Sequence, residues 1–324
     1  MALVDSHGRR INYLRLSVTD RCNLRCTYCM PPQGVEKLSC EDVLRYEELL
    51  ELAAAAVRVG IEKIRVTGGE PLVRKGLADF LAQLARLPGL NQLVLTTNGI
   101  FLAEQAAALR AAGVQRLNIS LDSLHPETFA GITRGGDLGR VLAGIAAAEA
   151  LGFPIKINMV VMRGINDAEV ADFAALTVAR PITVRFIEYM PAARVEDYRS
   201  LLVPGDEVLA AIARRFPLET AGRGELCGPA RNFRIAGAAG SLGVITPLSG
   251  HFCGDCNRIR VTSTGFARSC LFGDGAVDLK PFLAAGGDTL DGVLRRLVEE
   301  KPAGHRLDDP ALAPAAFTMA AIGG

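Results

Sequence analysis

The chain has 324 residues, 49% of them apolar, and its 36 basic residues nearly balance its 35 acidic ones, which leaves a net charge of +1. A chain of this length can bury a large core. The even charge balance argues against a basic nucleic-acid-binding body and against an acidic disordered chain, so we expect no nucleic-acid partner.

Charged residues come early, because Asp5, Arg9 and Arg10 precede any apolar run, and we therefore expect no signal peptide. The longest notable uncharged stretch, Ile235–Gly254, is rich in glycine and predicts turns and strands rather than a membrane helix. We expect a cytoplasmic protein that does not engage a membrane.

Short apolar runs predict six strands, at Tyr13–Val18, Glu62–Thr67, Gln92–Thr97, Gln115–Ser120, Ile155–Met162 and Ile182–Tyr189. Apolar residues at helical spacing predict helices between them, within Leu49–Val57, Leu77–Leu84, Leu102–Ala112, Gly139–Leu151 and Asp167–Ala179. Strict alternation of strand and helix predicts an α/β fold with a parallel sheet. Six such units are too few to close an eight-stranded barrel, so we expect a partial (β/α)6, TIM-like barrel.

Polar residues follow the predicted strands where they end, at Thr67, Thr96, Asn98, Ser120, Asp122 and Glu188. Active sites of barrels and open α/β sheets lie at the carboxyl ends of the strands, although Asp122 and Ser123 could equally cap helices or turns. The alternation stops after Met190, where helix candidates Val208–Arg215 and Leu290–Val298 flank a glycine-rich region. We expect a barrel domain over residues 1–190 and a smaller C-terminal domain over residues 191–324.

A first cysteine set, Cys22, Cys26 and Cys29, follows the first predicted strand with C-x3-C-x2-C spacing. Such spacing lets one loop wrap one metal centre, but three thiolates leave its ligand shell incomplete. An incomplete shell leaves an iron free for a substrate. The alternative is a zinc site completed by a distant residue.

A second cysteine set, Cys253, Cys256 and Cys270, lies near the end of the chain. Residues 229–272 carry five arginines against the single acidic residue Asp255, and Arg258 and Arg260 share one face of a predicted strand. A basic excess beside a metal centre favours an anionic substrate. The alternative is zinc held by these cysteines and His251. Cys40 and Cys227 stand alone, and we expect them to be ordinary thiols.

No Gly-Lys dipeptide occurs in the chain, so there is no Walker A loop to cradle phosphates. A polyphosphate would have to be held by side chains. Cationic residues are available at strand ends and beside the cysteines, namely Arg15, Lys63, Arg65, Lys156, Arg185, Arg258 and Arg260.

The first cysteine set, with Tyr28 before its third cysteine and Gly68-Gly69-Glu70-Pro71 after the second strand, resembles the radical S-adenosylmethionine (radical SAM) superfamily. The resemblance implies a partial barrel and a [4Fe–4S] cluster whose open iron is chelated by the amino and carboxylate groups of SAM. It also implies that the backbone of the Gly68-Gly69 segment meets the SAM amino group, where a Cβ would obstruct it.

The two cysteine sets, Arg258-Ile259-Arg260 and the terminal Gly323-Gly324 together resemble the GTP 3′,8-cyclase family of molybdenum cofactor biosynthesis over nearly the whole chain. The resemblance implies a second [4Fe–4S] cluster open to the guanine base. It implies SAM contacts from Tyr28, Gly69, Ser120 and Met190, and GTP contacts from Arg15, Arg65, Thr96, Lys156, Arg258, Ile259 and Arg260. We add Lys63 and Arg185 from their positions, and the resemblance gives Gly323 and Gly324 a part in the radical chemistry.

In the implied reaction, a 5′-deoxyadenosyl radical takes the C3′ hydrogen of GTP and C3′ then bonds to guanine C8, giving 3′,8-cyclo-7,8-dihydro-GTP. The implied partners are an external one-electron reductant, a second copy of the chain and cyclic pyranopterin monophosphate synthase as recipient of the product. A peptide-modifying maturase is a rival, although maturases typically carry more C-terminal cysteines. A non-enzymatic electron carrier or zinc-stapled binding protein is another.

Overall fold

The computed structural model describes residues 2–35, 38–39, 41–190, 198–222, 228–273, 275–285, 287–305 and 319. Strands β1 to β6 lie at Tyr13–Ser17, Lys63–Thr67, Gln92–Thr97, Arg116–Ser120, Ile155–Val161 and Thr183–Glu188. All six predicted strands are therefore confirmed to within two residues at either end. Helices α1, α2, α3, α5 and α6 connect them, at Tyr46–Val59, Leu77–Leu84, Leu102–Ala111, Leu138–Ala150 and Val170–Ala179.

Two short helical segments in this part of the chain were not predicted, helix α4 (Pro126–Thr133) and the 3-10 turn η1 (Pro71–Val73), and the helix predicted over Asp167–Ala179 begins as the 3-10 turn η2 (Asp167–Glu169) before α6. Helix α4 begins with proline at its first turn and spans 8 residues. So short a segment gives little periodicity to detect, because its stability comes from tertiary packing. Phe129 and Ile132 supply that packing, since both are buried.

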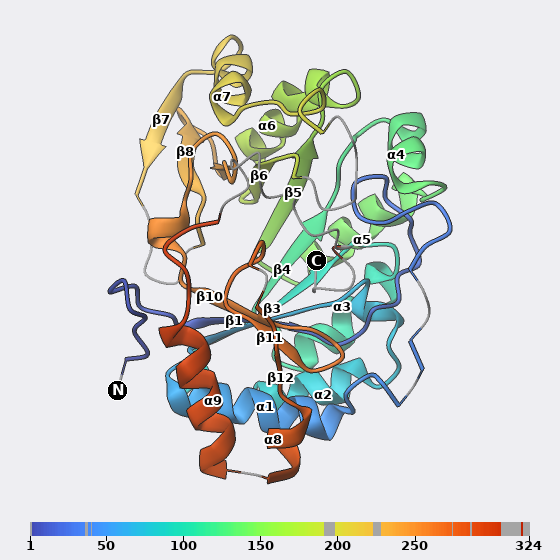
Figure 1. The fold of residues 1–324 in the computed structure, drawn as a ribbon. Helices are drawn as coiled ribbons and strands as arrows, with labels where there is room; N and C mark the ends of the chain where they lie inside the picture. The colour runs from blue at the N-terminus through green and yellow to red at the C-terminus, as the bar shows by residue number, and fades with distance from the viewer. Residues whose placement is uncertain are drawn as a thin grey trace.

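The strands form one 12-stranded sheet in the order β12-β11-β10-β1-β2-β3-β4-β5-β6-β9-β8-β7. Strands β1 to β6 are parallel, with β10 (Arg258–Val261) parallel to β1 and β9 (Ser241–Ile245) parallel to β6. The remaining strands, β7 (Leu218–Ala221), β8 (Arg231–Ile235), β11 (Phe266–Arg268) and β12 (Val277–Asp278), add antiparallel pairs at the two edges. The sheet curves but stays open, which confirms the partial barrel (Figure 1).

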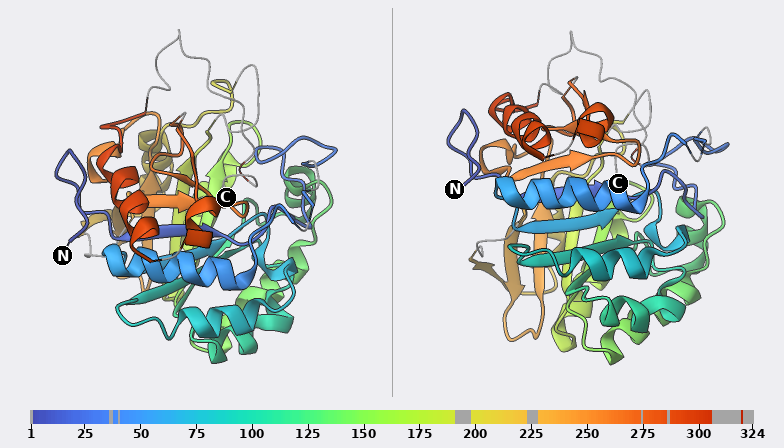
Figure 2. Two further views of the ribbon diagram at one scale, coloured as in Figure 1. Left: turned by 60° about the horizontal axis from the view of Figure 1, so that its bottom comes forward. Right: turned by 90° about the horizontal axis from the view of Figure 1, so that it is seen from below.

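The region after residue 190 extends both edges of this sheet, and its described residues include three further α-helices. Helix α7 (Gly205–Ala213) lies near α6, and helices α8 (Lys280–Ala285) and α9 (Gly287–Glu299) lie beside α1 (Figure 2). Arg58 of α1 pairs with Asp291 of α9 at 2.7 Å. Because its strands continue the barrel sheet, the C-terminal region brings its own side chains to the barrel interior. The domain boundary expected at residue 190 stays a prediction.

Each strand sends alternate side chains to opposite faces. On β1, Leu14 and Leu16 belong to the apolar core beneath the helices, whereas Tyr13 and Arg15 face the barrel interior beside Arg65. Apolar side chains thus hold the helices, and polar ones line the inside. No helix in the described parts of the chain is long and apolar enough to cross a membrane.

Candidate active site

The first cysteine set lies in the loop after β1, and the segment after β2 holds that loop by its backbone. The Gly69 N–H donates to the Thr19 carbonyl at 2.7 Å, and the Glu70 N–H donates to the Arg21 carbonyl at 2.8 Å. A Cβ on Gly69 would lie 2.4 Å from the Arg21 carbonyl oxygen. Glycine is therefore required here for the close approach of two backbone segments, a reason the sequence did not reveal.

Glu70 joins the cysteine loop to the end of β3: its backbone N–H binds the loop and its carboxylate binds residues 97 and 98. The sequence gave it no role. Its buried carboxylate accepts hydrogen bonds from Leu72 N at 3.0 Å, Thr97 Oγ1 at 2.8 Å and Asn98 N at 2.6 Å. Burial raises the pKa of Glu70 to about 7 against these hydrogen bonds. The Nδ2 group of Asn98, whose backbone is held by Glu70, donates to Cys22 Sγ at 3.8 Å.

Tyr28 and Asp122 form a second buried polar pair beside the first cysteine set. The Tyr28 hydroxyl donates to Asp122 Oδ2 at 2.7 Å, and the Val160 N–H donates to Asp122 Oδ1 at 2.8 Å. Burial raises the pKa of Asp122 to about 6 despite both hydrogen bonds. The hydrogen bond holds the Tyr28 side chain beside the first cysteine set, and Asp122, which the sequence offered both as an active-site residue and as a cap, lines the same cavity.

One cavity joins the first cysteine set to the arginines of the barrel interior. Its walls include the predicted residues Cys22, Cys26, Tyr28, Cys29, Gly69, Ser120 and Met190, and also Arg15, Arg65, Thr96, Arg185, Arg258 and Arg260. Thirteen predicted residues from distant parts of the chain are thus brought together.

Three predicted GTP contacts do not lie on the wall of this cavity among the described residues. Lys63 is buried beside the cavity-lining residue Tyr13, with its Nζ 4.7 Å from the centre of the Tyr13 ring. Lys156 is close enough to Lys63 for its charge to lower the pKa of Lys63. Ile259 is fully buried in the apolar core, on the opposite face of β10 from Arg258 and Arg260. Its side chain therefore packs against the helices and only its backbone could meet a ligand.

The barrel interior holds buried polar atoms without hydrogen-bond partners among the described residues. They include Arg15 Nε, Arg65 Nε, Thr96 Oγ1, Arg260 Nη1 and both side-chain polar atoms of Asn118. Burial and then the charges of Arg260 and Arg65 hold the pKa of Arg15 well below its usual value. Because such groups are normally satisfied, this surface is built for a polar, anionic ligand.

The second cysteine set lies on the 3-10 turn η3 (Cys253–Asp255) and on the loop after β11, with all three thiols half-buried. Burial alone would raise the pKa of Cys256, but the charges of Arg258 and Lys301 outweigh it and lower the pKa to about 7. In the described parts of the chain, no three His, Cys, Asp or Glu side chains converge on a single-ion site. The three half-buried thiols of each set match the donor set of a cluster with one open iron.

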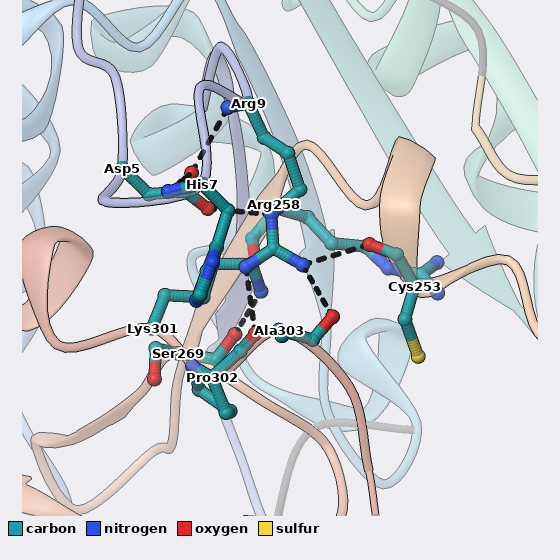
Figure 3. A network of polar contacts seen from close by, with 9 residues as sticks. All are labelled: Asp5, His7, Arg9, Cys253, Arg258, Ser269, Lys301, Pro302 and Ala303. Atoms are coloured by element: carbon teal, nitrogen blue, oxygen red, sulfur yellow. Dashed lines mark hydrogen bonds and ion pairs between the residues drawn. The ribbon is translucent and has the colours of Figure 1, made fainter.

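Two buried cations brace the second set from behind (Figure 3). Arg9 pairs with Asp5 at 2.6 Å and donates to the carbonyls of Cys253 at 2.8 Å, Pro302 at 2.7 Å and Ala303 at 3.0 Å. Lys301 donates to the carbonyls of Arg258, at 3.1 Å, and Ser269. Sequence reasoning missed both residues, because neither belongs to a motif.

The C-terminal tail reaches the first cysteine set. The Met319 N–H donates to the Cys29 carbonyl at 3.3 Å, and Met319 lies on the cavity wall. The predicted residues Gly323 and Gly324, and the single thiols Cys40 and Cys227, lie outside the described residues.

Comparison with known proteins agrees with these features. Residues 16–177 match the family model "Radical SAM superfamily", and residues 182–307 match "Molybdenum Cofactor Synthesis C". The chain is 64% identical to a GTP 3′,8-cyclase of Geobacter sulfurreducens, over 100% of both chains. It is 47% identical to a GTP 3′,8-cyclase of Moorella thermoacetica, over 99% of both chains.

Among solved structures, the chain resembles Streptococcus suis SuiB bound to precursor peptide SuiA. The TM-score is 0.60 at 14% identity, covering 89% of this chain and 68% of that one. So low an identity supports the fold alone.

Proposed function

Because the chain belongs to the GTP 3′,8-cyclase family of the radical SAM superfamily, we propose that the cavity beside the first cysteine set holds SAM and GTP side by side. The enzyme converts GTP to 3′,8-cyclo-7,8-dihydro-GTP, the first step of molybdenum cofactor biosynthesis. The observation that supports this arrangement is that the cavity beside the first cysteine set contains arginine atoms with no hydrogen-bond partner in the part of the chain that the structure describes.

Cys22, Cys26 and Cys29 are the ligands of the [4Fe–4S] cluster that radical SAM enzymes carry. With SAM bound, this cluster supplies the 5′-deoxyadenosyl radical that acts on C3′ of the ribose. The protein positions the two substrates: the Asp122 carboxylate fixes the Tyr28 ring, and Gly69 keeps the cysteine loop against β2. Tyr28, Gly69, Ser120 and Met190 are our proposed SAM contacts.

The triphosphate of GTP is the anion that the barrel interior suits. Within the described ranges of the chain, Arg15, Arg65 and Arg260 each have a buried guanidinium nitrogen without a hydrogen-bond partner, and so does the Thr96 hydroxyl. Charge-assisted hydrogen bonds to phosphate oxygens would satisfy these atoms and offset the burial of like charges. Arg185, Arg258 and Lys156 complete the proposed contact set, with Lys63 behind it.

Cys253, Cys256 and Cys270 are our proposed ligands of a second [4Fe–4S] cluster. Cys256 supports this, because its lowered pKa favours the thiolate that binds iron. Three thiolates leave one iron open, and the guanine base is the proposed ligand there. Anaerobic reconstitution should then give about eight irons per chain, from four in each cluster.

The C-terminal glycines are proposed to act in the radical chemistry. Met319, five residues before the end of the chain, already touches the first cysteine loop. A Gly-Gly end can enter a narrow site and offer backbone N–H groups. Deletion of Gly323 and Gly324 should leave GTP binding and both clusters intact yet stop product formation; a truncated enzyme that keeps the normal rate would remove this role.

The remaining proposed partners are an external one-electron reductant, a second copy of the chain and the synthase that receives the product. The reaction itself is tested by SAM cleavage with and without GTP under reducing, anaerobic conditions. GTP-dependent cyclic product supports the cyclase. Cleavage that responds to a peptide and never yields cyclic nucleotide would support the maturase alternative instead.

A further inference from the structure

Lys301 is a buried cation whose negative neighbours are sulfur atoms. Its side chain is 3% exposed, and in the described parts of the chain no carboxylate pairs with it. Its ammonium lies at backbone carbonyls beside Cys256 and Cys270, and the thiolates of these two cysteines favour its charged form. A buried ammonium is unfavourable without a counter-charge, and thiolates at Cys256 and Cys270 would supply one.

The contacts of Lys301 place it against the second cysteine set from two sides. Its ammonium donates to the carbonyl of Arg258, two residues after Cys256, and to that of Ser269, immediately before Cys270. These bonds tie together the two backbone segments that carry two of the three thiols. Arg9 differs from Lys301, because the carboxylate of Asp5 already balances the charge of Arg9.

We propose that Lys301 is a positioning residue for the second cluster, acting as the counter-charge of its thiolates. This rests on the proposed cluster at Cys253, Cys256 and Cys270. Thiolate-ligated clusters carry net negative charge, and nearby donors and charges set their stability and reduction potential. A buried lysine bonded to the segments that carry two ligand cysteines balances that charge and fixes the separation of those segments.

The proposal is tested in full-length protein with Cys22, Cys26 and Cys29 changed to Ser, so that only the second set can bind iron. Lys301→Gln keeps a donor but removes the charge, Lys301→Arg keeps the charge, and Lys301→Met removes both. Lys280→Met is the matched control, because Lys280 also donates to a backbone carbonyl, that of Asp42, away from both cysteine sets.

Iron loss to a chelator should be about 10- to 100-fold faster for Lys301→Gln and Lys301→Met, as for other residues that support metal ligands. The midpoint potential should fall in the same variants, because removal of a positive charge disfavours the reduced cluster. Lys301→Arg and Lys280→Met should stay close to the parent protein. If Lys301→Met does not fold, the comparison of Gln with Arg decides.

Two failures are distinguishable. If the parent protein with only the second set takes up no iron, the second cluster of the proposed function is wrong. If it takes up iron but Lys301→Gln keeps the parent rate and potential, Lys301 merely ties two backbone segments and the counter-charge role is overturned.

Discussion

The guanidinium of Arg9 donates to the carbonyl oxygen of Cys253 at 2.8 Å across 244 positions of sequence. The same group donates to the carbonyls of Pro302 and Ala303, so one side chain joins the N-terminal segment that carries Arg9 to the second cysteine set and to residues 302–303. These contacts join three segments that are far apart in the sequence.

Arg9→Met should lower the free energy of unfolding by about 3–5 kcal/mol, because it leaves the buried Asp5 carboxylate without its partner. Arg10→Met is the control: the side chain of Arg10 is 55% exposed and its pair with Glu62 should contribute under about 1 kcal/mol. Urea unfolding of the metal-free protein measures both. Equal decreases in the free energy of unfolding for the two variants would contradict the stabilising role of Arg9.

Gly69→Ala should disrupt the first cysteine loop, since the new methyl would meet the Arg21 carbonyl at 2.4 Å. We expect a loss of about 1–3 kcal/mol in stability and weak iron uptake by the first set. Gly131→Ala in α4 meets nothing within 4 Å and should be neutral or slightly stabilising. Normal iron uptake by the Gly69 variant would show that the loop is not held this closely.

Arg258→Ala and Arg260→Ala should each weaken GTP binding by roughly 1.5–3 kcal/mol, or about 10- to 150-fold, because each removes a charge-assisted contact. Exposed Arg86 on the outer surface gives the control, Arg86→Ala. Equilibrium binding of GTP to the unreduced enzyme measures the effect without turnover. Wild-type affinity in both interior variants would exclude this row of arginines from the substrate site.

Lys63 should take up a proton when GTP binds. Burial, then the charges of Arg65 and Arg116, lower the pKa of Lys63 to about 6, so it is mostly neutral at pH 7. A bound triphosphate favours the charged form and raises the pKa, so affinity should fall as pH rises above about 6. Calorimetry in buffers of different ionisation enthalpy measures the uptake, and Lys63→Gln should remove that part of it. Identical proton uptake in both proteins would contradict the assignment.

Sequence reasoning predicted the parts of this molecule that local pattern encodes. The strands and the first cysteine set follow from short apolar runs and close spacing, which depend little on the rest of the chain. The parallel pairing of β9 and β10 with opposite edges of the sheet is not local, and it was missed. Without that pairing, the placement of Arg258 and Arg260 inside the barrel rested on resemblance.

The missed site residues share a physical reason. Glu70, Arg9 and Lys301 act through backbone atoms and buried charges that meet only in the folded chain. A single arginine or lysine in sequence is most often a surface charge, so nothing marked these two as buried. Gly69 was singled out as a SAM contact, which stays a prediction, and its close contact with Arg21 needed the structure.

The central claim is that the cavity presents C3′ of GTP to the radical made at the first cysteine set. The most direct measurement is anaerobic turnover of GTP carrying deuterium at C3′, followed by mass analysis of the 5′-deoxyadenosine formed from SAM. We predict one deuterium in 5′-deoxyadenosine, together with a matching amount of 3′,8-cyclo-7,8-dihydro-GTP. Unlabelled 5′-deoxyadenosine formed alongside unchanged GTP would contradict the account.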